Sequence, residues 1–218
     1  MIVRSYTPED RLEVERIHFE TGFLGRSMDM ILSDSALWDQ KIAWYLDREP
    51  ESAFVLDDGS VVGYLVGCLD DTQNYELHPL RAMRHFVSDA VRSLRLPAED
   101  RQFWMRRISH LGEVVVGHSG ERHLKTPENA GHLHINLVAD ARGRGYGTKL
   151  LRAFESYALS NGVATLHAES FETRVNPNSS FWDRNGFEVY SRVPTTFWKP
   201  FLPDEDVSIV SYSKRIAH

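Results

Sequence analysis

A strand-like run, a glycine-rich loop and an amphipathic helix follow one another between residues 132 and 160, and this order constrains the fold most. The loop reads Arg142-Gly143-Arg144-Gly145-Tyr146-Gly147. Glycine adopts positive φ and lets a backbone approach a ligand closely. The amides that open a helix lack intrahelical partners, and the helix dipole adds about half a positive charge there. The sequence therefore predicts a pyrophosphate cradle at this turn.

Two other phosphate-binding loops do not fit the spacing of these glycines. A dinucleotide fingerprint that starts at Gly143 would need glycine where Thr148 stands, and one that starts at Gly145 would need glycine where Leu150 stands. A P-loop needs glycine directly before its lysine, but Lys149 follows Thr148. The cradle is therefore expected to belong to neither class.

Strand and helix patterns alternate along the rest of the 218 residues. The expected strands cover 2–6, 53–56, 60–69, 132–138, 163–170, 187–192 and 207–213, and the expected helices start at Thr7-Pro8 or cover 35–47, 145–160 and 178–185. Residues 70–131 predict one or two helices and a long loop inserted between strands, with their arginines on a solvated helix face. We expect a single domain over 1–218.

Composition narrows the class of protein. The 42% hydrophobic and 26% charged content is ordinary for a soluble domain, and the net charge of −6 argues against broad binding to nucleic acid or to anionic membranes. Cys68 is the only cysteine; it excludes an internal disulfide, fits a reducing compartment and is expected to be buried. The first residues lack the apolar run of a signal peptide, and no run reaches membrane-spanning length. A cytoplasmic location is expected.

Two motifs resemble a known family. The spacing Arg142-x-x-Gly145-x-Gly147 matches the Arg/Gln-x-x-Gly-x-Gly/Ala signature of GCN5-related N-acetyltransferases (GNAT), and Phe181-Trp182-Asp183-Arg184-Asn185-Gly186-Phe187 resembles that family's Phe-Tyr-x-x-x-Gly-Phe segment. The run His132-Leu133-His134-Ile135-Asn136-Leu137, after a long insertion, most resembles the branch that contains the carboxy-terminal acetyltransferase-like domain of O-GlcNAcases. The resemblance implies an α/β fold with a mixed, mostly antiparallel sheet flanked by helices and with two splayed strands.

The same resemblance implies that acetyl-coenzyme A (acetyl-CoA) lies between the splayed strands and reacts with an amine acceptor, without a metal. The backbone of Asn136, Leu137 and Val138 would pair with the pantetheine arm, and Asn176 or Asn178 would lie near the cofactor. The residues whose amides would hold the pyrophosphate are Arg142, Gly143, Arg144, Gly145, Tyr146, Gly147 and Thr148.

Acetyl transfer to an amine needs a proton acceptor, because a lysine-like amine of pKa about 10.4 is protonated at neutral pH. Strand alternation puts His132 and His134 on one face together with Asn136, and His167 and Glu169 on one face of the next strand. An imidazole of pKa about 6.5 is suited to this proton transfer. We predict the base among His132, His134 and Glu169; structural, hydrogen-bonded histidines and a solvated Glu169 are the alternative.

Trp182 stands where the family carries a tyrosine that acts as general acid. An indole donates a hydrogen bond but does not titrate usefully, although a thiolate leaving group of pKa about 8.5 needs little help. The prediction is therefore an N-acetyltransferase that works by direct attack. The alternatives are an acyl-CoA-binding module with little or no activity, in which Trp182 is core packing, and a disfavoured metal site at the strand histidines and Glu169.

Overall fold

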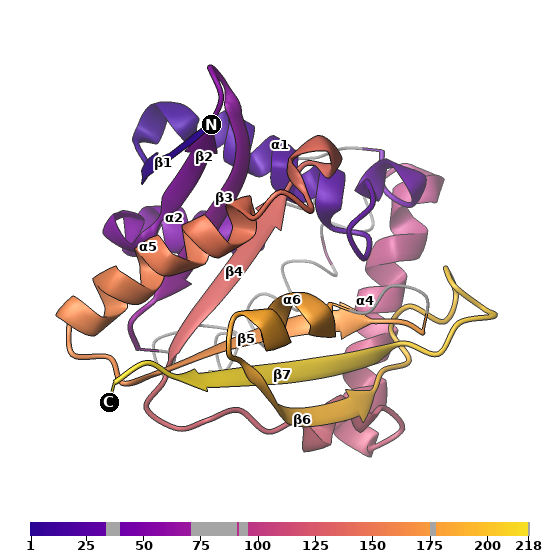
Figure 1. The fold of residues 1–218 in the computed structure, drawn as a ribbon. Helices are drawn as coiled ribbons and strands as arrows, with labels where there is room; N and C mark the ends of the chain where they lie inside the picture. The colour runs from indigo at the N-terminus through magenta and orange to yellow at the C-terminus, as the bar shows by residue number, and fades with distance from the viewer. Residues whose placement is uncertain (34–39, 71–90, 92–95, 175–177, 218) are drawn as a thin grey trace.

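The computed structural model describes residues 1–33, 40–70, 91, 96–174 and 178–217. Within them, a mixed sheet runs in the order β1-β2-β3-β4-β5-β7-β6 (Figure 1). Its strands are β1 (Ile2–Ser5), β2 (Phe54–Asp57), β3 (Val61–Cys68), β4 (Gly131–Leu137), β5 (Thr165–Glu172), β6 (Glu188–Pro194) and β7 (Ser208–Arg215). Only β4 and β5 pair in parallel; the other described pairs are antiparallel. The predicted fold class is confirmed.

Helices cover both faces of this sheet (Figure 1). The described α-helices are α1 (Arg11–Thr21), α2 (Gln40–Arg48), α4 (Ala98–Val116), α5 (Tyr146–Ser160) and α6 (Ser179–Arg184). On β3, Leu65 packs with α5 on one face, whereas its neighbours Tyr64 and Val66 pack with α1 and α2 on the other. This alternation places the two cores on opposite sides of the sheet.

The expected starts and stops of the first helices are close to those observed. The helix at Thr7-Pro8 begins with a 3-10 turn, Pro8–Asp10, and the carboxylate of Asp10 accepts from the Thr7 amide at 2.8 Å. Gly22 is the C-cap of α1. Of the helix expected over 35–47, residues 40–47 are helical and 35–39 lie outside the described residues.

The strands β4 and β5 part soon after they meet. Their register contains only Gly131 opposite Leu166 and His132 opposite His167. In contrast, β4 stays paired with β3 from Cys68 opposite His132 up to Gly63 opposite Leu137. Among the described strands, β4 beyond His132 thus pairs with β3 alone, and this is the splay that the family resemblance implies.

Helix α4 lies in the predicted insertion. In Figure 1 it runs beside the half of the sheet that is formed by β5, β7 and β6. Its Phe103 and Trp104 are fully buried and share a core with Phe23, Met28 and Trp198. Residues 71–90 and 92–95, which belong to the predicted insertion, lie outside the described residues. Through Phe103 and Trp104, the described part of this segment contributes to the core.

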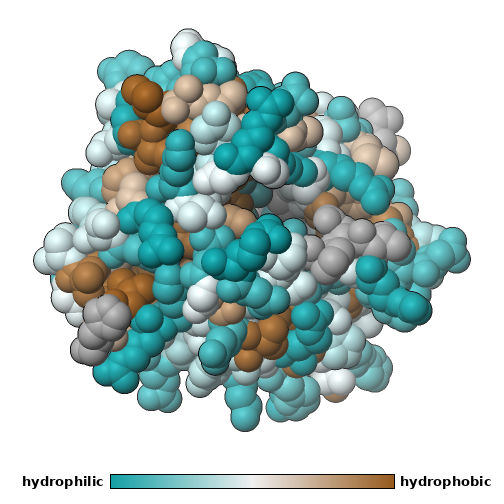
Figure 2. All heavy atoms as spheres, viewed as in Figure 1, coloured by the Kyte–Doolittle hydropathy of each residue, from teal (hydrophilic) through white to brown (hydrophobic). Residues whose placement is uncertain are grey.

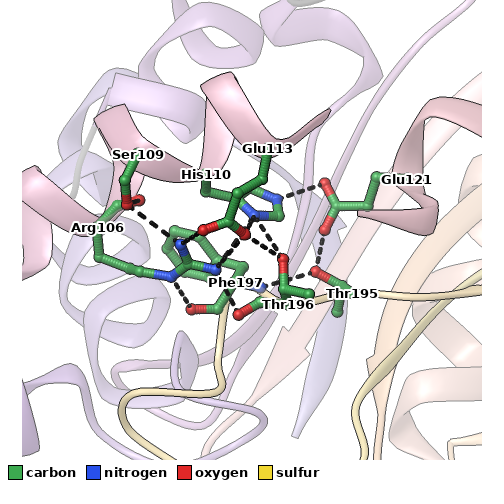
Figure 3. Close-up of polar contacts among 8 residues, drawn as sticks. All are labelled: Arg106, Ser109, His110, Glu113, Glu121, Thr195, Thr196 and Phe197. Carbon is green, nitrogen blue, oxygen red and sulfur yellow. Dashed lines mark hydrogen bonds and ion pairs between the residues drawn. The ribbon is translucent and has the colours of Figure 1, made fainter. Parts of the chain in front are cut away.

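Arg106 contradicts the expectation that the arginines of this segment lie on a solvated face, because it is 9% exposed. Its guanidinium binds both carboxylate oxygens of Glu113, at 2.6 and 3.0 Å, and donates to the carbonyl oxygens of Thr196 and Phe197 (Figure 3). We call Arg106, Glu113, Thr196 and Phe197 the α4 clasp. A planar guanidinium suits such a site because its donors match a carboxylate and still reach two carbonyls. The clasp ties α4 to the connection between β6 and β7.

The α4 clasp makes folding stability depend on pH in the acid range. The Arg106 guanidinium lowers the pKa of Glu113 from 4.5 to about 2. The stabilisation is therefore complete above pH 4.5 and is lost as the pH falls toward about 2. We expect Glu113→Gln to lower the free energy of unfolding by roughly 2 kcal/mol at about pH 7 and by much less near pH 3, measured by urea denaturation.

Glu128→Gln is the control for this prediction, since Glu128 is exposed. It is expected to change the unfolding free energy by less than about 0.5 kcal/mol at either pH. An effect of Glu113→Gln that stays constant or grows as the pH falls would contradict the assigned ion pair.

Gly67 allows α5 to lie close against β3. A Cβ at Gly67 would lie 2.4 Å from the Phe154 ring and 2.7 Å from the carbonyl oxygen of His132. We expect Gly67→Ala to lower the free energy of unfolding by about 3 kcal/mol, because neither the ring nor the backbone can move away freely. Gly112→Ala in α4, where a Cβ would meet nothing within 4 Å, is expected to raise it by roughly 0.5–1 kcal/mol. Equal urea midpoints for the two variants would refute this packing.

Hydrophilic residues dominate the face shown in Figure 2, and hydrophobic ones form small separate groups among them. Cys68 is buried, as expected. No helix in the described residues is both long and apolar enough to cross a membrane.

Candidate active site

A cavity of about 820 Å³ lies where β4 and β5 part. Side chains and backbone from α1, α2, β4, the loop after β4, β5, α6 and the β6–β7 connection line it. One end is formed by the glycine-rich loop, and the other by the histidines of β4 and β5. A single cavity therefore joins the predicted cofactor site to the predicted base residues.

The glycine-rich loop forms the amino end of α5. Gly143 and Gly145 have φ of 71° and 80°, and a Cβ at either position would meet nothing within 4 Å. Gly145 is the N-cap of α5, and its carbonyl accepts from Lys149 at 3.2 Å. Within the described part of the chain, the amides of residues 143–148 make no backbone hydrogen bond outside the helix. These donors are available at the edge of the cavity, as the pyrophosphate cradle requires.

Most of the predicted cofactor residues line the cavity. Those that do are Asn136, Leu137, Arg142, Gly143, Gly145, Gly147, Thr148 and Asn178. Those that do not are Val138, Arg144 and Tyr146. Asn176 lies outside the described residues. The Val138 amide donates to the carbonyl of Val62 at 3.0 Å, so it belongs to the β3 side of the strand.

Gly147 has a packing role that the sequence pattern did not indicate. A Cβ at this position would lie 2.9 Å from the ring of Phe181 on α6. The first turn of α5 and helix α6 therefore approach closely only because residue 147 has no side chain. Glycine is thus needed at 147 for close packing of the two helices. At 143 and 145 it is needed for the positive φ of the loop.

The predicted base residues are brought together at the other end of the cavity. His132, His134, His167 and Glu169 all line it, and the His132 and His167 ring centroids are 4.8 Å apart. The hydroxyl of Tyr45, on α2, lies 2.7 Å from Nδ1 of His132. Glu169 is exposed, as the solvated-acid reading expects. The Tyr45 hydroxyl thus lies where it can orient the His132 ring within the cavity.

Two residues of the site were missed by the sequence reasoning. His18 of α1 lines the cavity, is 3% exposed and lies 2.9 Å from the Tyr64 hydroxyl through Nδ1. That hydroxyl accepts from the side-chain amide of Asn136 at 2.9 Å, and the same nitrogen lies 3.1 Å from Nε2 of His134. His18 follows Val14 by four residues and so lies on the apolar face of α1. A histidine on that face was the one feature of the sequence that could have indicated a buried polar site.

Trp182 is both core and cavity wall. It is 5% exposed and stacks on Tyr212, with ring centroids 5.5 Å apart. Within the described residues, its Nε1 has no hydrogen-bond partner. Tyr212 does not replace the missing tyrosine acid, because its hydroxyl donates to Glu172 and burial raises its pKa. Trp182 thus packs in the core, and its role in the reaction stays a prediction.

Among the described residues, no group of three or more histidine, cysteine, aspartate or glutamate side chains is arranged to hold a metal ion. The disfavoured hypothesis of a metal site at the strand histidines therefore gains no support from the geometry.

The parted sheet and the glycine-rich start of α5 define an acetyltransferase fold, and solved structures share it. SsHAT matches at 29% identity with a TM-score of 0.66, over 100% of this chain and 98% of that one. An N-acetyltransferase from Staphylococcus aureus Mu50 matches at 16% identity and TM-score 0.55, with 99% and 98% covered. The putative acetyltransferase yncA from Salmonella typhimurium, solved with its cofactor acetyl-CoA, matches at 13% identity and TM-score 0.57, with 100% and 95% covered.

The family model of the acetyltransferase (GNAT) family matches residues 79–187, which is half of the chain. The chain belongs to the acetyltransferase (GNAT) family. The predicted family is thus confirmed, while the finer likeness to the O-GlcNAcase branch stays a prediction.

Proposed function

We propose that this protein is an acetyl-CoA-dependent N-acetyltransferase in which an amine attacks the thioester directly, without an acyl-enzyme. One observation carries the proposal: the amides at the start of α5 open into a cavity that also reaches His132. A cofactor held at one end by its pyrophosphate would thus extend its thioester toward a group able to accept a proton.

The pyrophosphate binds the amides of residues 143–148, and the positive end of the α5 dipole adds to their attraction. The pantetheine arm follows Asn136 and Leu137, on the side of β4 that β5 leaves after His132. Arg142 donates from Nε to the Leu137 carbonyl at 2.8 Å, which joins the loop to the end of β4. Asn178, whose Nδ2 donates to Ser170 at 2.7 Å, lines the same end of the cavity.

His132 accepts the proton of the attacking amine. In this arrangement Nδ1–H of His132 donates to the Tyr45 oxygen, and Nε2 receives the proton as the nitrogen–carbon bond forms. The bond between the carbonyl carbon and sulfur then breaks, and coenzyme A leaves as a thiolate of ordinary pKa, about 8.5. Trp182 supplies no proton in this scheme, so the thiolate takes one from His132 or from solvent.

The second candidate is an acyl-CoA-binding module with little or no catalysis, and Trp182 in place of a tyrosine acid favours it. Both candidates place acetyl-CoA in the same cavity. We also propose that residues 1–218 form one domain with an insertion at about 70–131. The acceptor carries an amine; the resemblance to the O-GlcNAcase branch does not define its class, because one fold serves many substrates.

Calorimetry with acetyl-CoA and with acetyl-pantetheine tests the proposed site. We expect acetyl-CoA to bind at least about 100-fold more tightly, since acetyl-pantetheine lacks the pyrophosphate, and charge-assisted hydrogen bonds contribute about 1.5–3 kcal/mol each. Equal affinity for the two ligands would refute the cradle.

Release of coenzyme A across a panel of amines then separates the enzyme from the binding module. A thiol reagent can report the product, since the only cysteine, Cys68, is buried. Release that depends on an added amine supports the transferase. Tight binding of acetyl-CoA with no release for any amine class favours the binding module.

A further inference from the structure

Four polar side chains form a connected network across α1, β3 and β4, and three of them, His18, His134 and Asn136, line the cavity. The Tyr64 hydroxyl lies between Nδ1 of His18 and Nδ2 of Asn136, at 2.9 Å from each. Nδ2 of Asn136 also lies 3.1 Å from Nε2 of His134. The His18 and His134 rings meet edge to face, with centroids 5.4 Å apart. The network therefore joins two cavity-lining histidines through one amide and one hydroxyl.

An amide nitrogen can only donate, so its contacts fix the direction of the neighbouring bonds. Asn136 gives one hydrogen to the Tyr64 oxygen and the other to Nε2 of His134. Nε2 of His134 is then an acceptor, and a neutral ring carries its hydrogen on Nδ1. If the Tyr64 hydroxyl directs its own hydrogen to Nδ1 of His18, the hydrogen of His18 lies on Nε2.

We propose that Asn136 is a positioning residue that holds the hydrogen of His134 on Nδ1, so that His134 acts in the cavity as a hydrogen-bond donor and not as the base. A hydrogen on Nε2 of His134 would point at an amide hydrogen of Asn136, which disfavours that tautomer. This assignment separates the two histidines of β4: His132, oriented by Tyr45, takes the proton, and His134 donates. Only this division of roles rests on the proposed function; the hydrogen position does not.

The network also couples the two tautomers. If the Asn136 amide were reversed, its oxygen would face Nε2 of His134 and the Tyr64 hydroxyl, and both histidines would carry the opposite hydrogen. In the first arrangement His18 carries its hydrogen on Nε2 and His134 on Nδ1. With the amide reversed, His18 carries its hydrogen on Nδ1 and His134 on Nε2. Measurement of either ring therefore reports the direction of the whole network.

Two-bond proton–nitrogen NMR of the full chain, labelled at histidine nitrogen, reads the tautomers directly. The signals are assigned with His18→Gln and His134→Gln. Near neutral pH we expect His134 protonated on Nδ1 alone and His18 on Nε2 alone. A His134 ring protonated on Nε2, or on both nitrogens, would overturn the proposal.

Tyr64→Phe and Tyr45→Phe form a matched pair, because each removes one hydroxyl from beside a different histidine. Tyr64→Phe releases the amide to rotate, so the signals of His18 and His134 should both change, whereas Tyr45→Phe should change those of His132. Asn136→Asp offers a carboxylate acceptor to Nε2 of His134, and we expect the hydrogen of His134 to move to Nε2. This variant tests the proposal even if Tyr64→Phe folds poorly. Unchanged His134 signals in Asn136→Asp would refute the positioning role.

Turnover supplies a second readout. His134→Gln keeps a nitrogen donor and is expected to retain at least about a tenth of kcat, while His132→Gln loses about 100-fold or more. Equal losses would refute the division of roles. If acetyl-CoA did not bind at all, the proposed function would fail, but the NMR result would still decide the hydrogen position.

Discussion

Replacing Gly145 by aspartate is expected to weaken acetyl-CoA binding by at least about 100-fold, or roughly 2.7 kcal/mol. Two effects act together. The carboxylate would enter the open space before α5 and repel the pyrophosphate, and the φ of 80° at this position disfavours most side chains. Calorimetry with acetyl-CoA measures the loss, and circular dichroism shows whether the variant is folded.

Gly162→Asp is the matched control, since Gly162 lies just beyond the carboxyl end of the same helix. It too has a positive φ, 82°, and open space around its missing Cβ. The same strain and charge there should leave the affinity within about twofold, because the cradle is at the other end of α5. Gly145→Asn, which is neutral and tolerates positive φ, should fall between the two. Equal affinities in Gly145→Asp and Gly162→Asp would end the case for the cradle.

Replacing His132 by glutamine is expected to lower kcat by about 10²–10⁴-fold near neutral pH, the usual contribution of a general base. The affinity for acetyl-CoA should change little, since His132 lies at the opposite end of the cavity from the glycine-rich loop. The measurement is steady-state release of coenzyme A with an amine that the wild type acetylates. The rate of the variant should rise with pH as more of the amine loses its proton without help.

Tyr45→Phe tests the partner of this base. It removes the hydroxyl 2.7 Å from Nδ1 of His132 but keeps the ring, so we expect a smaller loss, about tenfold, and a shifted pH profile. Glu169→Gln is the comparison within the same cavity. If His132→Gln kept the full kcat and Glu169→Gln lost it, the general base would be Glu169 and not His132.

The sequence predicted well those features that depend on neighbours along the chain. The Thr7-Pro8 helix start and the amphipathic α5 each rest on caps or periodicity within a few residues. The sign of φ at Gly143 and Gly145 follows from the same local chemistry. Local rules suffice there because the interacting groups are close in sequence.

The interior of the site could not be predicted in the same way. Arg106 was expected on the surface, yet it is held by carbonyls about ninety positions away in the chain. His18 and Tyr64 carried no motif, and no sequence pattern indicated the contact between Tyr45 and His132. Such contacts join α1, α2, β3 and β4, and no periodicity within one element encodes them.

By itself, then, the sequence determined the phosphate-binding character of the loop before α5, because glycine conformation and helix-end amides are properties of a short segment. Only the tertiary structure decided which histidine meets Tyr45 and which meets Asn136. His132 and His134 share a face of one strand, but α2 lies over the first and α1 and β3 surround the second. The physical reason is that a side chain's role in proton transfer depends on the hydrogen-bond partners that packing brings to it.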